Sequence, residues 1–276
     1  MDRNDLDFAA RCTAGEGWIT ETREEFEGFL AHDPAGCLLA LAGDEPAAMV
    51  IATCYGEHGF VGELIVDRQV RLLGLGKTML ERAIEYLRSY GCHSIALDGV
   101  PRAVPYYESV GFRRVCRSLR LVGRIPGRAD PAVRPMRESD LDAVSRLDRR
   151  AFGADRSFFL RRRLQLYPEL GKVLNEDGEV RGFILGRRRP GLVWAGPWYA
   201  DPRVTEPERL LRSLALESEG SDLGLGILDR GTHALSIASA LGFRQKPNPS
   251  WRMVLGDSDG PGLAPELLAI GTAAKG

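Results

Sequence analysis

Cysteine and histidine are scarce in this sequence, and neither is spaced as in a metal site. Five cysteines and four histidines are scattered over 276 residues, with no CxxC pair and no HExxH spacing. A disulfide framework usually shows an even number of closely spaced cysteines, and a zinc site needs clustered ligands. We therefore expect no metal and no disulfide framework, and we expect a reducing, cytoplasmic location.

The sequence also lacks a long apolar run and an excess of one charge. No run approaches the roughly 20 apolar residues that a membrane-spanning helix needs, and the residues from Met1 to Asp5 are polar, unlike a secretory signal. Lys and Arg number 37 and Asp and Glu number 38, which gives a formal net charge of −1 at pH 7. These absences predict no membrane partner and no nucleic-acid partner held by a strong positive field.

The composition is that of a globular protein with two domains. Hydrophobic residues make up 44% of the chain and charged residues 27%, which is close to the composition of ordinary globular proteins. A length of 276 residues corresponds to about two domains. The Gly- and Pro-rich stretch 123–131 predicts a linker, so we expect one domain over residues 1–125 and a second over residues 132–276.

The apolar pattern of the first domain predicts a mixture of helices and strands. The expected helices lie over residues 3–13, 20–31, 75–90 and 104–110, and the expected strands over residues 37–42, 47–55, 60–66, 94–97 and 112–122. In helix 75–90, Leu80, Ala83 and Leu87 share one face, and Gly91 follows as a C-cap. The first two strands are expected to form a hairpin.

The second domain repeats part of this plan. The segment Ala238–Arg244 (ASALGFR) mirrors the segment Tyr107–Arg113 (YESVGFR), because in both a short helix stops at glycine and a strand begins with Phe-Arg. Such a repeat indicates two copies of one fold, the second of them diverged. Within the second copy, the stretch Arg187–Gly191 (RRRPG) predicts an exposed hairpin turn.

The most informative segment joins the strand that ends at Val66 to the helix that follows. It reads Arg71-Leu72-Leu73-Gly74-Leu75-Gly76-Lys77. Two glycines allow a tight turn and a close ligand, and the N–H groups of the first helical turn favour an anion such as a pyrophosphate. The side chains of Arg71 and Lys77 can add charge-assisted contacts. From these residues alone, the segment is either a phosphate-binding loop or an ordinary structural turn.

Two motifs in this half resemble a known family. Arg71-x-x-Gly74-x-Gly76 is similar to the Q/R-x-x-G-x-G/A signature of the GNAT acyltransferase superfamily. Leu97–Phe112 resembles that family's second diagnostic segment, in which a tyrosine stands four residues before Gly-Phe. This resemblance covers about residues 5–122. The second half resembles the C-terminal domain of YitH-type bacterial GNAT proteins, on the stretches Phe152–Arg156 and Gly196–Trp198.

The resemblance implies an α/β (α+β) fold of two tandem GNAT-like domains, each a mixed, mainly antiparallel sheet flanked by helices. It also implies an N-acetyltransferase that moves an acetyl group from acetyl-CoA directly to an amine of a small molecule or a protein. Tyr107 matches the family's general acid, which protonates the departing thiolate. The implied acetyl-CoA contacts are Leu64, Ile65, Val66, Arg71, Leu72, Leu73, Gly74, Leu75, Gly76 and Lys77.

Within that set, the main chain of Leu64, Ile65 and Val66 corresponds to the part that pairs with the pantetheine arm, like an added strand. The amide of about Leu64 corresponds to the group that polarises the thioester carbonyl. The sequence departs from the family at Leu72 and Leu73, where a glycine and a basic residue are common. This departure predicts a modest affinity for CoA.

A general base is harder to name. The acceptor amine must lose a proton, and a carboxylate can take it directly or through water. Glu63 is the first choice, with Glu16 and Asp98 as alternatives. If Leu64 and Val66 face the core, strand alternation turns Glu63 to the other face, where it could be a solvated surface residue. Asp98 is alternatively a cap of the turn that follows it.

The second domain lacks the residues that the chemistry needs. No Arg-x-x-Gly-x-Gly precedes its helix near residues 206–218, and Ala238 stands at the position of Tyr107. We therefore expect no acyl-CoA site there, but a part in shaping the acceptor pocket or in forming a homodimer. The alternative function for the whole chain is a CoA-binding sensor without turnover, which would keep the phosphate loop and would not need Tyr107.

Overall fold

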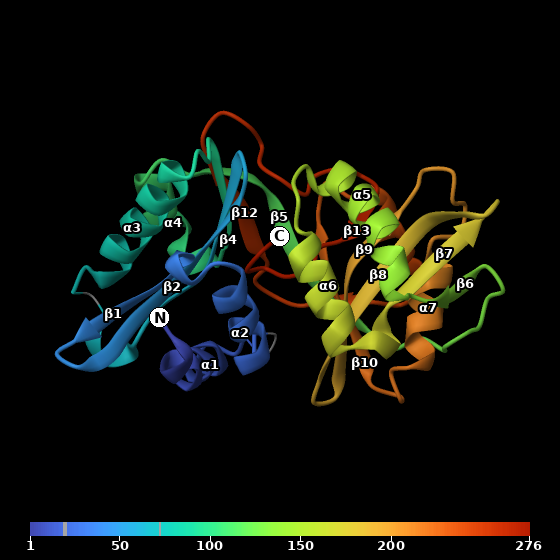
Figure 1. Cartoon of the computed structure of the whole chain (residues 1–276), viewed down its shortest axis with the longest axis horizontal. Helices are drawn as coiled ribbons and strands as arrows, with labels where there is room; N and C mark the ends of the chain where they lie inside the picture. The colour runs from blue at the N-terminus through green and yellow to red at the C-terminus, as the bar shows by residue number, and fades with distance from the viewer. Residues whose placement is uncertain (19–20, 72) are drawn as a thin grey trace. The chain divides into compact units, whose positions relative to one another are not determined.

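The computed structural model describes residues 1–18, 21–71 and 73–276, and its contacts group them into two compact units. The first unit consists of residues 1–97 and 254–260 together with Lys275. The second unit consists of residues 98–253 and 261–274 together with Gly276. Figure 1 labels the helices and strands of both units.

The first unit is a sheet with helices packed on it. Its strands lie in the order β1-β2-β3-β4, with β2 antiparallel to β1 and β3, and with β4 parallel to β3. Helix α3 packs against β1, β2 and β3, and α1 packs against α2 and β3 (Figure 1). The elements are η1 (Arg3–Asp5), α1 (Leu6–Gly15), α2 (Arg23–His32), η2 (Pro34–Gly36), β1 (Cys37–Ala42), β2 (Glu45–Tyr55), β3 (His58–Val66), η3 (Arg68–Val70), α3 (Leu75–Ser89) and β4 (Ser94–Gly99), whose last two residues belong to the second unit.

Helix α3 is amphipathic, as the sequence predicts. Its buried residues recur every three or four positions and lie on the side that packs against the sheet. They are Met79, Leu80, Ala83, Ile84 and Leu87. The helix begins after Gly74 and ends at Ser89, within one residue of the predicted range. The burial of this stripe fixes the rotation of the helix, so its first turn is held at the end of β3.

The second unit is a larger mixed sheet. Its strand order is β12-β5-β10-β9-β8-β7-β6, with β11 paired to β5 and β13 paired to β9. Strand β10 is parallel to β9 and antiparallel to β5. The elements are η4 (Pro101–Ala103), α4 (Val104–Ser109), β5 (Arg113–Gly123), β6 (Val133–Pro135), η5 (Glu138–Asp140), α5 (Leu141–Phe152), α6 (Ser157–Leu166), η6 (Pro168–Leu170), β7 (Lys172–Glu176), β8 (Glu179–Arg189), β9 (Leu192–Ala200), α7 (Glu208–Leu216), β10 (Asp222–Leu228), α8 (Thr232–Ala240), β11 (Arg244–Gln245), β12 (Ser250–Leu255) and β13 (Leu267–Ala269).

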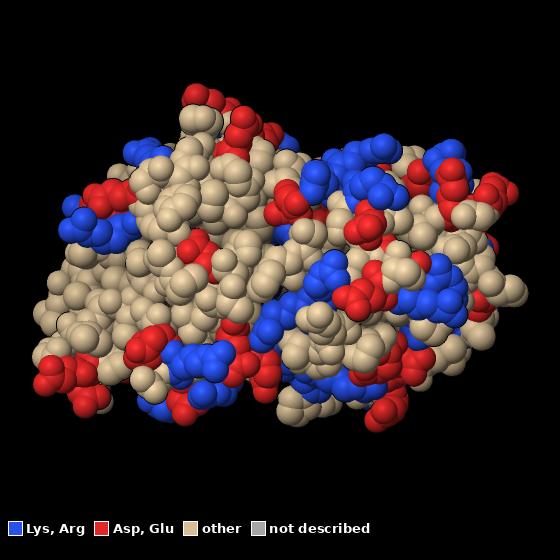
Figure 2. Space-filling model, viewed as in Figure 1, with Lys and Arg blue, Asp and Glu red and all other residues tan. Residues whose placement is uncertain are grey.

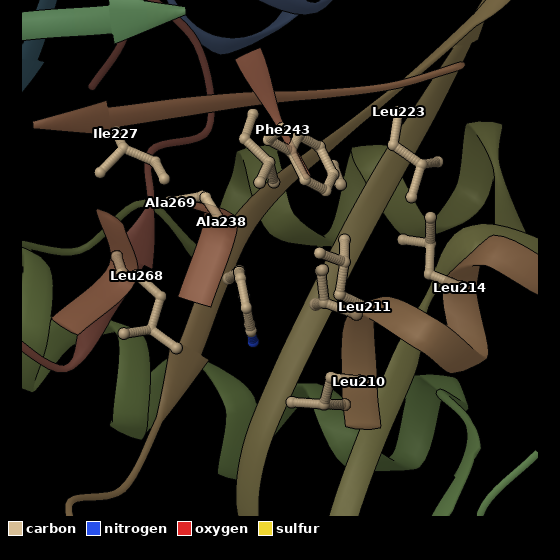
Figure 3. Packing of buried hydrophobic residues seen from close by; sticks show 14 of the residues in the cluster. Leu210, Leu211, Leu214, Leu223, Ile227, Ala238, Phe243, Leu268 and Ala269 are labelled. Carbon is tan, nitrogen blue, oxygen red and sulfur yellow. The ribbon is translucent and has the colours of Figure 1, made fainter. Parts of the chain in front are cut away.

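The core of the second unit forms where α7 covers the sheet. Leu210, Leu211 and Leu214 lie on one face of α7, and they belong to one buried cluster with Leu223 and Ile227 of β10 (Figure 3). All nine residues of β9 are buried. A strand buried along its whole length does not show the alternation of apolar and polar residues that marks a half-exposed strand.

The structure confirms the internal repeat. The first repeat runs from β1 to β5 (residues 37–123), and the second runs from β7 to β12 (residues 172–255). The N–H of Phe112 donates to the carbonyl of Tyr107 at 3.0 Å, and the N–H of Phe243 donates to the carbonyl of Ala238 at 2.9 Å. The α4–β5 and α8–β11 junctions therefore share one backbone arrangement, with Tyr107 and Ala238 at equivalent positions.

The compact units do not coincide with the two repeats. Strand β5 ends the first repeat in sequence, but it lies in the second unit, where it pairs with β10. Residues 254–260, which are the last two residues of β12 and the five that follow it, are grouped with the first unit. The domain limits 1–125 and 132–276 follow the repeats, and they stay a prediction.

The hairpin turn predicted over residues 187–191 is present at Pro190 and Gly191, but the prediction that the arginines belong to it is wrong. Strand β8 continues to Arg189, and Arg187 is fully buried, with 0% of its surface exposed. Only Pro190 and Gly191 connect β8 to β9, so the turn is two residues long and excludes the arginines. The arginine run resembles an exposed turn in sequence, but pairing with β9 carries it into the sheet.

The surface and the helices agree with the composition. Acidic and basic side chains are interspersed on the face drawn in Figure 2, and the formal net charge of the chain is −1 at pH 7. Among the described residues, every helix is too short or too polar to cross a bilayer.

Candidate functional site

Strand β3 carries a bulge close to its end. Met49 of β2 pairs with Ile65, and Ile51 pairs with Gly62, so Glu63 and Leu64 together stand opposite Val50. A bulge of this kind interrupts the ladder and leaves a backbone amide outside it. The extra residue also shifts the alternation of side chains along the strand.

The bulge decides where the Glu63 side chain lies. Glu63 has a positive φ of 52°, and only 7% of its surface is exposed. The alternative in which Glu63 is a solvated surface residue is therefore wrong. It rested on regular alternation, which the bulge breaks. Glu63 is thus a buried carboxylate at an irregular strand edge, and its role as the proton acceptor stays a prediction.

Beyond the bulge, β3 is paired on one side only. The ladder with β4 ends at Val61 and Leu97, whereas the ladder with β2 continues to Val66. Among the described residues of the first unit, the segment 62–66 thus has no strand on its β4 side. Its backbone N–H and C=O groups can accept an extended ligand as a further strand. The predicted residues Leu64, Ile65 and Val66 lie on this segment.

The chain after β3 is held in place by Asp67. The N–H of Asp67 donates to the carbonyl of Ala47 at 2.8 Å, and its carboxylate accepts from the N–H of Gln69 at 2.9 Å. The N–H of Val70 donates back to the carbonyl of Asp67 at 3.1 Å. These bonds fix the direction in which the chain leaves the sheet toward α3.

Helix α3 begins at a glycine that needs an unusual backbone conformation. Gly74 has φ +82°, in the left-handed region that favours glycine. Among the described residues, a Cβ at Gly74 would meet nothing within 4 Å, and one at Gly76 would meet only the Cγ2 of Val66, at 3.5 Å. The first turn of α3 is therefore open on its outer side, where backbone N–H groups and the helix dipole favour an anion.

The basic side chains around this loop differ in how far their existing contacts leave them able to reach a bound phosphate. Arg71 donates from Nε to the carbonyl of Val66 at 3.0 Å and pairs with the Glu16 carboxylate at 2.5 Å. Arg68 donates to the carbonyl of Gly15 at 2.7 Å, so two arginines tie the loop to the end of α1. Lys77 forms a longer ion pair with Glu81, at 3.8 Å, and its side chain is 65% exposed. Lys77 is thus the cation better placed to reach a bound phosphate.

The leucines of the loop carry the departure from the family pattern. Leu73 is 74% exposed, so its side chain does not fill the space beside Gly74. Leu72 lies outside the described residues. The predicted set Leu64–Val66, Arg71, Leu73, Gly74, Leu75, Gly76 and Lys77 is brought together in the first unit, on the end of β3, the loop and the start of α3.

Tyr107, the predicted acid, belongs to α4 in the second unit. It is 9% exposed, and its ring packs edge-on against Phe112 with 6.0 Å between the centroids. Burial, with a smaller contribution from Tyr106, raises the pKa of Tyr107 to about 12 from the ordinary value of 10. The phenol therefore stays protonated at neutral pH, so Tyr107 can donate a proton but cannot accept one.

Asp98 has a structural role that the sequence did not predict. It lies in β4, and its carboxylate accepts from Nε of Arg252 at 2.6 Å and from the hydroxyl of Ser118 at 2.7 Å. Burial pushes the pKa of Asp98 upward, but the guanidinium groups of Arg252 and Arg120 outweigh it and hold the pKa below its ordinary value. Asp98 is therefore a poor base, and the prediction that it caps a turn is wrong.

The second repeat has an equivalent bulge with different residues. Ile184 of β8 pairs with Trp198 and Gly186 pairs with Ala195, so Gly196 and Pro197 stand opposite Leu185. Proline has no backbone N–H. The position that Leu64 occupies in β3 therefore has no amide donor in β9.

The open edge of the second repeat is filled by the chain itself. Strand β13 pairs with β9, with Leu267 beside Tyr199 and Ala269 beside Trp198. On the other side, the N–H of Ile270 donates to the carbonyl of Gly226 in β10 at 2.9 Å. Residues 267–270 therefore occupy the gap that opens between β9 and β10 after Ala195 and Leu225, the last pair of their ladder.

Among the described residues, no three or more His, Cys, Asp or Glu side chains are grouped closely enough to hold a metal ion.

Two family models match the chain. The acetyltransferase (GNAT) family matches residues 4–112, and an acetyltransferase (GNAT) domain matches residues 144–264. The two matches fall on either side of the stretch 123–131.

Individual acyltransferases and a solved structure are also similar to this chain over most of its length. The chain is 25% identical to the uncharacterized N-acetyltransferase YitH of Bacillus subtilis over 202 residues, covering 71% of this chain and 69% of that protein. It is 26% identical to a holothin acyltransferase of Pseudoalteromonas over 200 residues, covering 71% and 67%. The crystal structure of a putative acetyltransferase from Pyrococcus horikoshii superposes with a TM-score of 0.83 at 24% identity, covering 100% of this chain and 94% of that one.

Proposed function

We propose that this chain, which belongs to the GNAT superfamily and is an acyltransferase with two tandem GNAT domains, transfers an acetyl group from acetyl-CoA to an amine. The observation that carries this proposal is the form of the first repeat. The bulged strand β3 has one unpaired edge and leads directly into a helix that starts at a glycine. A pantetheine arm fits such an edge, and a pyrophosphate fits such a helix start.

In this proposal, the backbone of Leu64, Ile65 and Val66 binds the pantetheine arm. The amides from Leu72 to Lys77 bind the pyrophosphate, and the exposed ammonium of Lys77 adds a charge-assisted contact. Arg71 acts through the loop, because its guanidinium is paired with Glu16 and bonded to the carbonyl of Val66. The space beside Gly74 supports this assignment, since among the described residues a Cβ at Gly74 would meet nothing within 4 Å.

The proposed reaction is a direct attack of the amine on the thioester. A C–N bond forms and the C–S bond breaks, while the amide of Leu64 stabilises the negative charge that develops on the carbonyl oxygen. Glu63 takes the proton that the amine loses, directly or through water. Tyr107 gives its proton to the departing thiolate, which its raised pKa allows because the phenol is protonated at neutral pH.

The acceptor is an amine of a small molecule or of a protein. The fold alone does not select between them, since the same architecture serves many acceptors. We also propose that the second repeat binds no acyl-CoA. Pro197 removes the amide donor, and β13 fills the strand edge.

The test is a thermal-shift titration with acetyl-CoA on the wild-type protein and on two variants. Ligand at about 100 times its dissociation constant stabilises a protein by roughly 2.7 kcal/mol, which is a shift of a few degrees. Gly74→Glu should abolish the shift, because a carboxylate then stands where the phosphate binds. Gly178→Glu is the matched control, since Gly178 also has a positive φ, +79°, and open space around it.

The two variants distinguish a loss of acetyl-CoA binding at the loop from a general effect of placing a side chain on a left-handed backbone. If both variants lose the shift, the loss reflects the left-handed backbone and not the loop. If the wild-type protein shows no shift with acetyl-CoA at any concentration, the first repeat does not bind it and the proposal fails.

A further inference from the structure

Two thiols lie against each other in the first unit. Cys54 is near the end of β2, and Cys92 lies in the turn that precedes β4. Their Sγ atoms are 3.3 Å apart, and both approach the carbonyl of Gly56, at 3.6 Å from Cys54 and 3.3 Å from Cys92. A disulfide bond is about 2.05 Å long, so the two sulfurs need to move together by roughly 1.2 Å.

The two thiols differ in their access to solvent. Cys92 is buried, with 3% of its surface exposed, whereas Cys54 is half-buried. An oxidant from solution therefore reaches Cys54 first. Burial, together with the neighbouring Cys54 thiol, raises the pKa of Cys92 to about 12, so Cys92 is almost entirely a thiol at neutral pH. Because the thiolate is the nucleophile, Cys92 is expected to react slowly. The sulfur within its reach is that of Cys54, at 3.3 Å.

We propose that Cys54 and Cys92 form a dithiol site that reacts with hydrogen peroxide or an organic hydroperoxide and closes to an intramolecular disulfide. In the first step, the sulfur of Cys54 attacks the peroxide, an S–O bond forms, the O–O bond breaks, and water or an alcohol leaves. In the second step, the sulfur of Cys92 attacks that of Cys54. An S–S bond forms, the S–O bond breaks, and a water molecule leaves. The peroxide is reduced, and the two thiols are oxidised.

The position of the pair gives the bridge a consequence. The two cysteines are 38 positions apart, and the chain between them contains β3, the loop after it and α3. A bridge would therefore enclose the whole segment to which we assign the pantetheine and pyrophosphate contacts. By restricting the unfolded chain, it is expected to raise the melting temperature by several degrees. Closure is expected over minutes to hours, because the attacking thiol of Cys92 is rarely ionised.

The test is peptide mapping of the fully reduced, folded protein after exposure to hydrogen peroxide. Digestion without reductant should yield one linked pair of peptides, joined through Cys54 and Cys92 and lighter than the sum of the two by two hydrogens. Dithiothreitol should separate them. If Cys54 is instead oxidised to sulfinic or sulfonic acid, or if either cysteine links to a different thiol, the proposal is wrong.

Three variants assign the two roles. Cys92→Ser should accumulate a sulfenic acid on Cys54 that dimedone labels, because the resolving thiol is gone. Cys54→Ser should form neither the label nor the bridge. Cys12→Ser is the control, since Cys12 is a half-buried thiol in α1. In this variant the bridge between Cys54 and Cys92 should form as in the wild type. Equal labelling of Cys54 in the wild-type and Cys92→Ser proteins would show that Cys92 does not resolve the sulfenic acid. Because the test reads covalent links and not turnover, its result is independent of the proposed acyl transfer.

Discussion

In the first repeat the bulge of β3 sets Glu63 and Leu64 opposite Val50, and in the second the bulge of β9 sets Gly196 and Pro197 opposite Leu185. The two bulges share this register, but their backbones and their chemistry differ, since Glu63 has φ +52° whereas Gly196 has φ +154° and a cis peptide bond to Pro197. Leu64 has an amide N–H that an oxyanion can use, and Pro197 has none. Of the two bulges, only that of β3 therefore has an amide donor at this position.

The strand edges next to the two bulges show the same contrast. The edge of β3 beyond Val61 is free of a strand partner among the described residues of its unit, whereas the edge of β9 is paired with β13. The covering segment lies very close to the bulge, because a Cβ at Gly196 would be 2.2 Å from the carbonyl oxygen of Ile270. In the second repeat the protein supplies the hydrogen-bonding partner that a ligand supplies in the proposed site of the first.

The loops after the two strands begin alike and then diverge. Asp201 repeats the bonds of Asp67: its N–H donates to the carbonyl of Arg181 at 2.8 Å, and its carboxylate accepts from the N–H of Arg203 at 3.0 Å. The helix that follows begins after Pro207, with Glu208 in its first turn. A proline removes an N–H group and a carboxylate repels a phosphate, so this helix start is unsuited to an anion.

The largest effect is expected at the position where the repeats have Tyr107 and Ala238. Tyr107→Phe should lower kcat by about 10²–10⁴, because the thiolate then leaves without a proton, and it should leave the dissociation constant of acetyl-CoA almost unchanged. Steady-state kinetics and calorimetry measure the two quantities. Tyr106→Phe is the matched control, since the neighbouring ring is not assigned a proton.

The same variant tests the sensor alternative. A protein that binds acetyl-CoA but shows no turnover with any amine, and for which Tyr107→Phe changes nothing, is a binding module. Equal losses in Tyr106→Phe and Tyr107→Phe would point to packing of α4 instead of proton donation.

The next effect is expected at the bulge. Leu64→Pro copies the residue of the second repeat into the first and removes one amide N–H. If that amide stabilises the oxyanion, kcat should fall by about 10²–10³. Leu64→Ala keeps the amide and should keep most of the rate, and melting curves of both variants report whether the strand still folds. A similar loss of kcat in Leu64→Ala would contradict the role of the backbone.

A smaller effect, on stability, should distinguish the covered edge from the open one. Gly196→Ala forces a Cβ against the carbonyl of Ile270 at 2.2 Å and also strains a backbone with φ +154°. The free energy of unfolding should fall by about 1–3 kcal/mol. Gly76→Ala is the counterpart, because within the described part of the chain its Cβ meets only the Cγ2 of Val66, at an ordinary 3.5 Å. Denaturant unfolding measures both, and equal losses would mean that β13 does not constrain β9.

Local patterns predict the fold of the first repeat well. The stripe of Leu80, Ala83 and Leu87 identifies α3, and the turn residues after Ala42 separate β1 from β2. These signals are local in sequence, because the apolar periodicity and the turn-forming glycines act on residues that are close together in the chain. The loop glycines and Tyr107 were found by the same means, together with the resemblance to a family.

The features that the sequence did not reveal depend on distant partners. The bulge at Glu63 is defined by its register against β2, and a bulge has no side-chain signature of its own. The ion pair of Arg71 with Glu16 joins residues 55 positions apart, and that of Asp98 with Arg252 joins residues 154 positions apart. Arg187 is buried because β8 pairs with β9, which a run of three arginines does not indicate. Such contacts come from the topology and not from the local pattern.

The smallest expected effect is that of alkaline pH on the proposed acid. The pKa of Tyr107 is raised to about 12 from its ordinary 10, so the folded protein holds this proton more tightly than the unfolded chain. Its contribution to stability is complete below the unfolded pKa and is lost as the pH rises from about 10 to about 12. Below roughly pH 10 the acid form persists in the folded protein, so kcat should rise as the amine deprotonates and then stay level up to that pH. A pH profile of kcat with an alkaline limb centred well below pH 10 would mean that another group is the acid, because a buried phenol with a raised pKa cannot produce it.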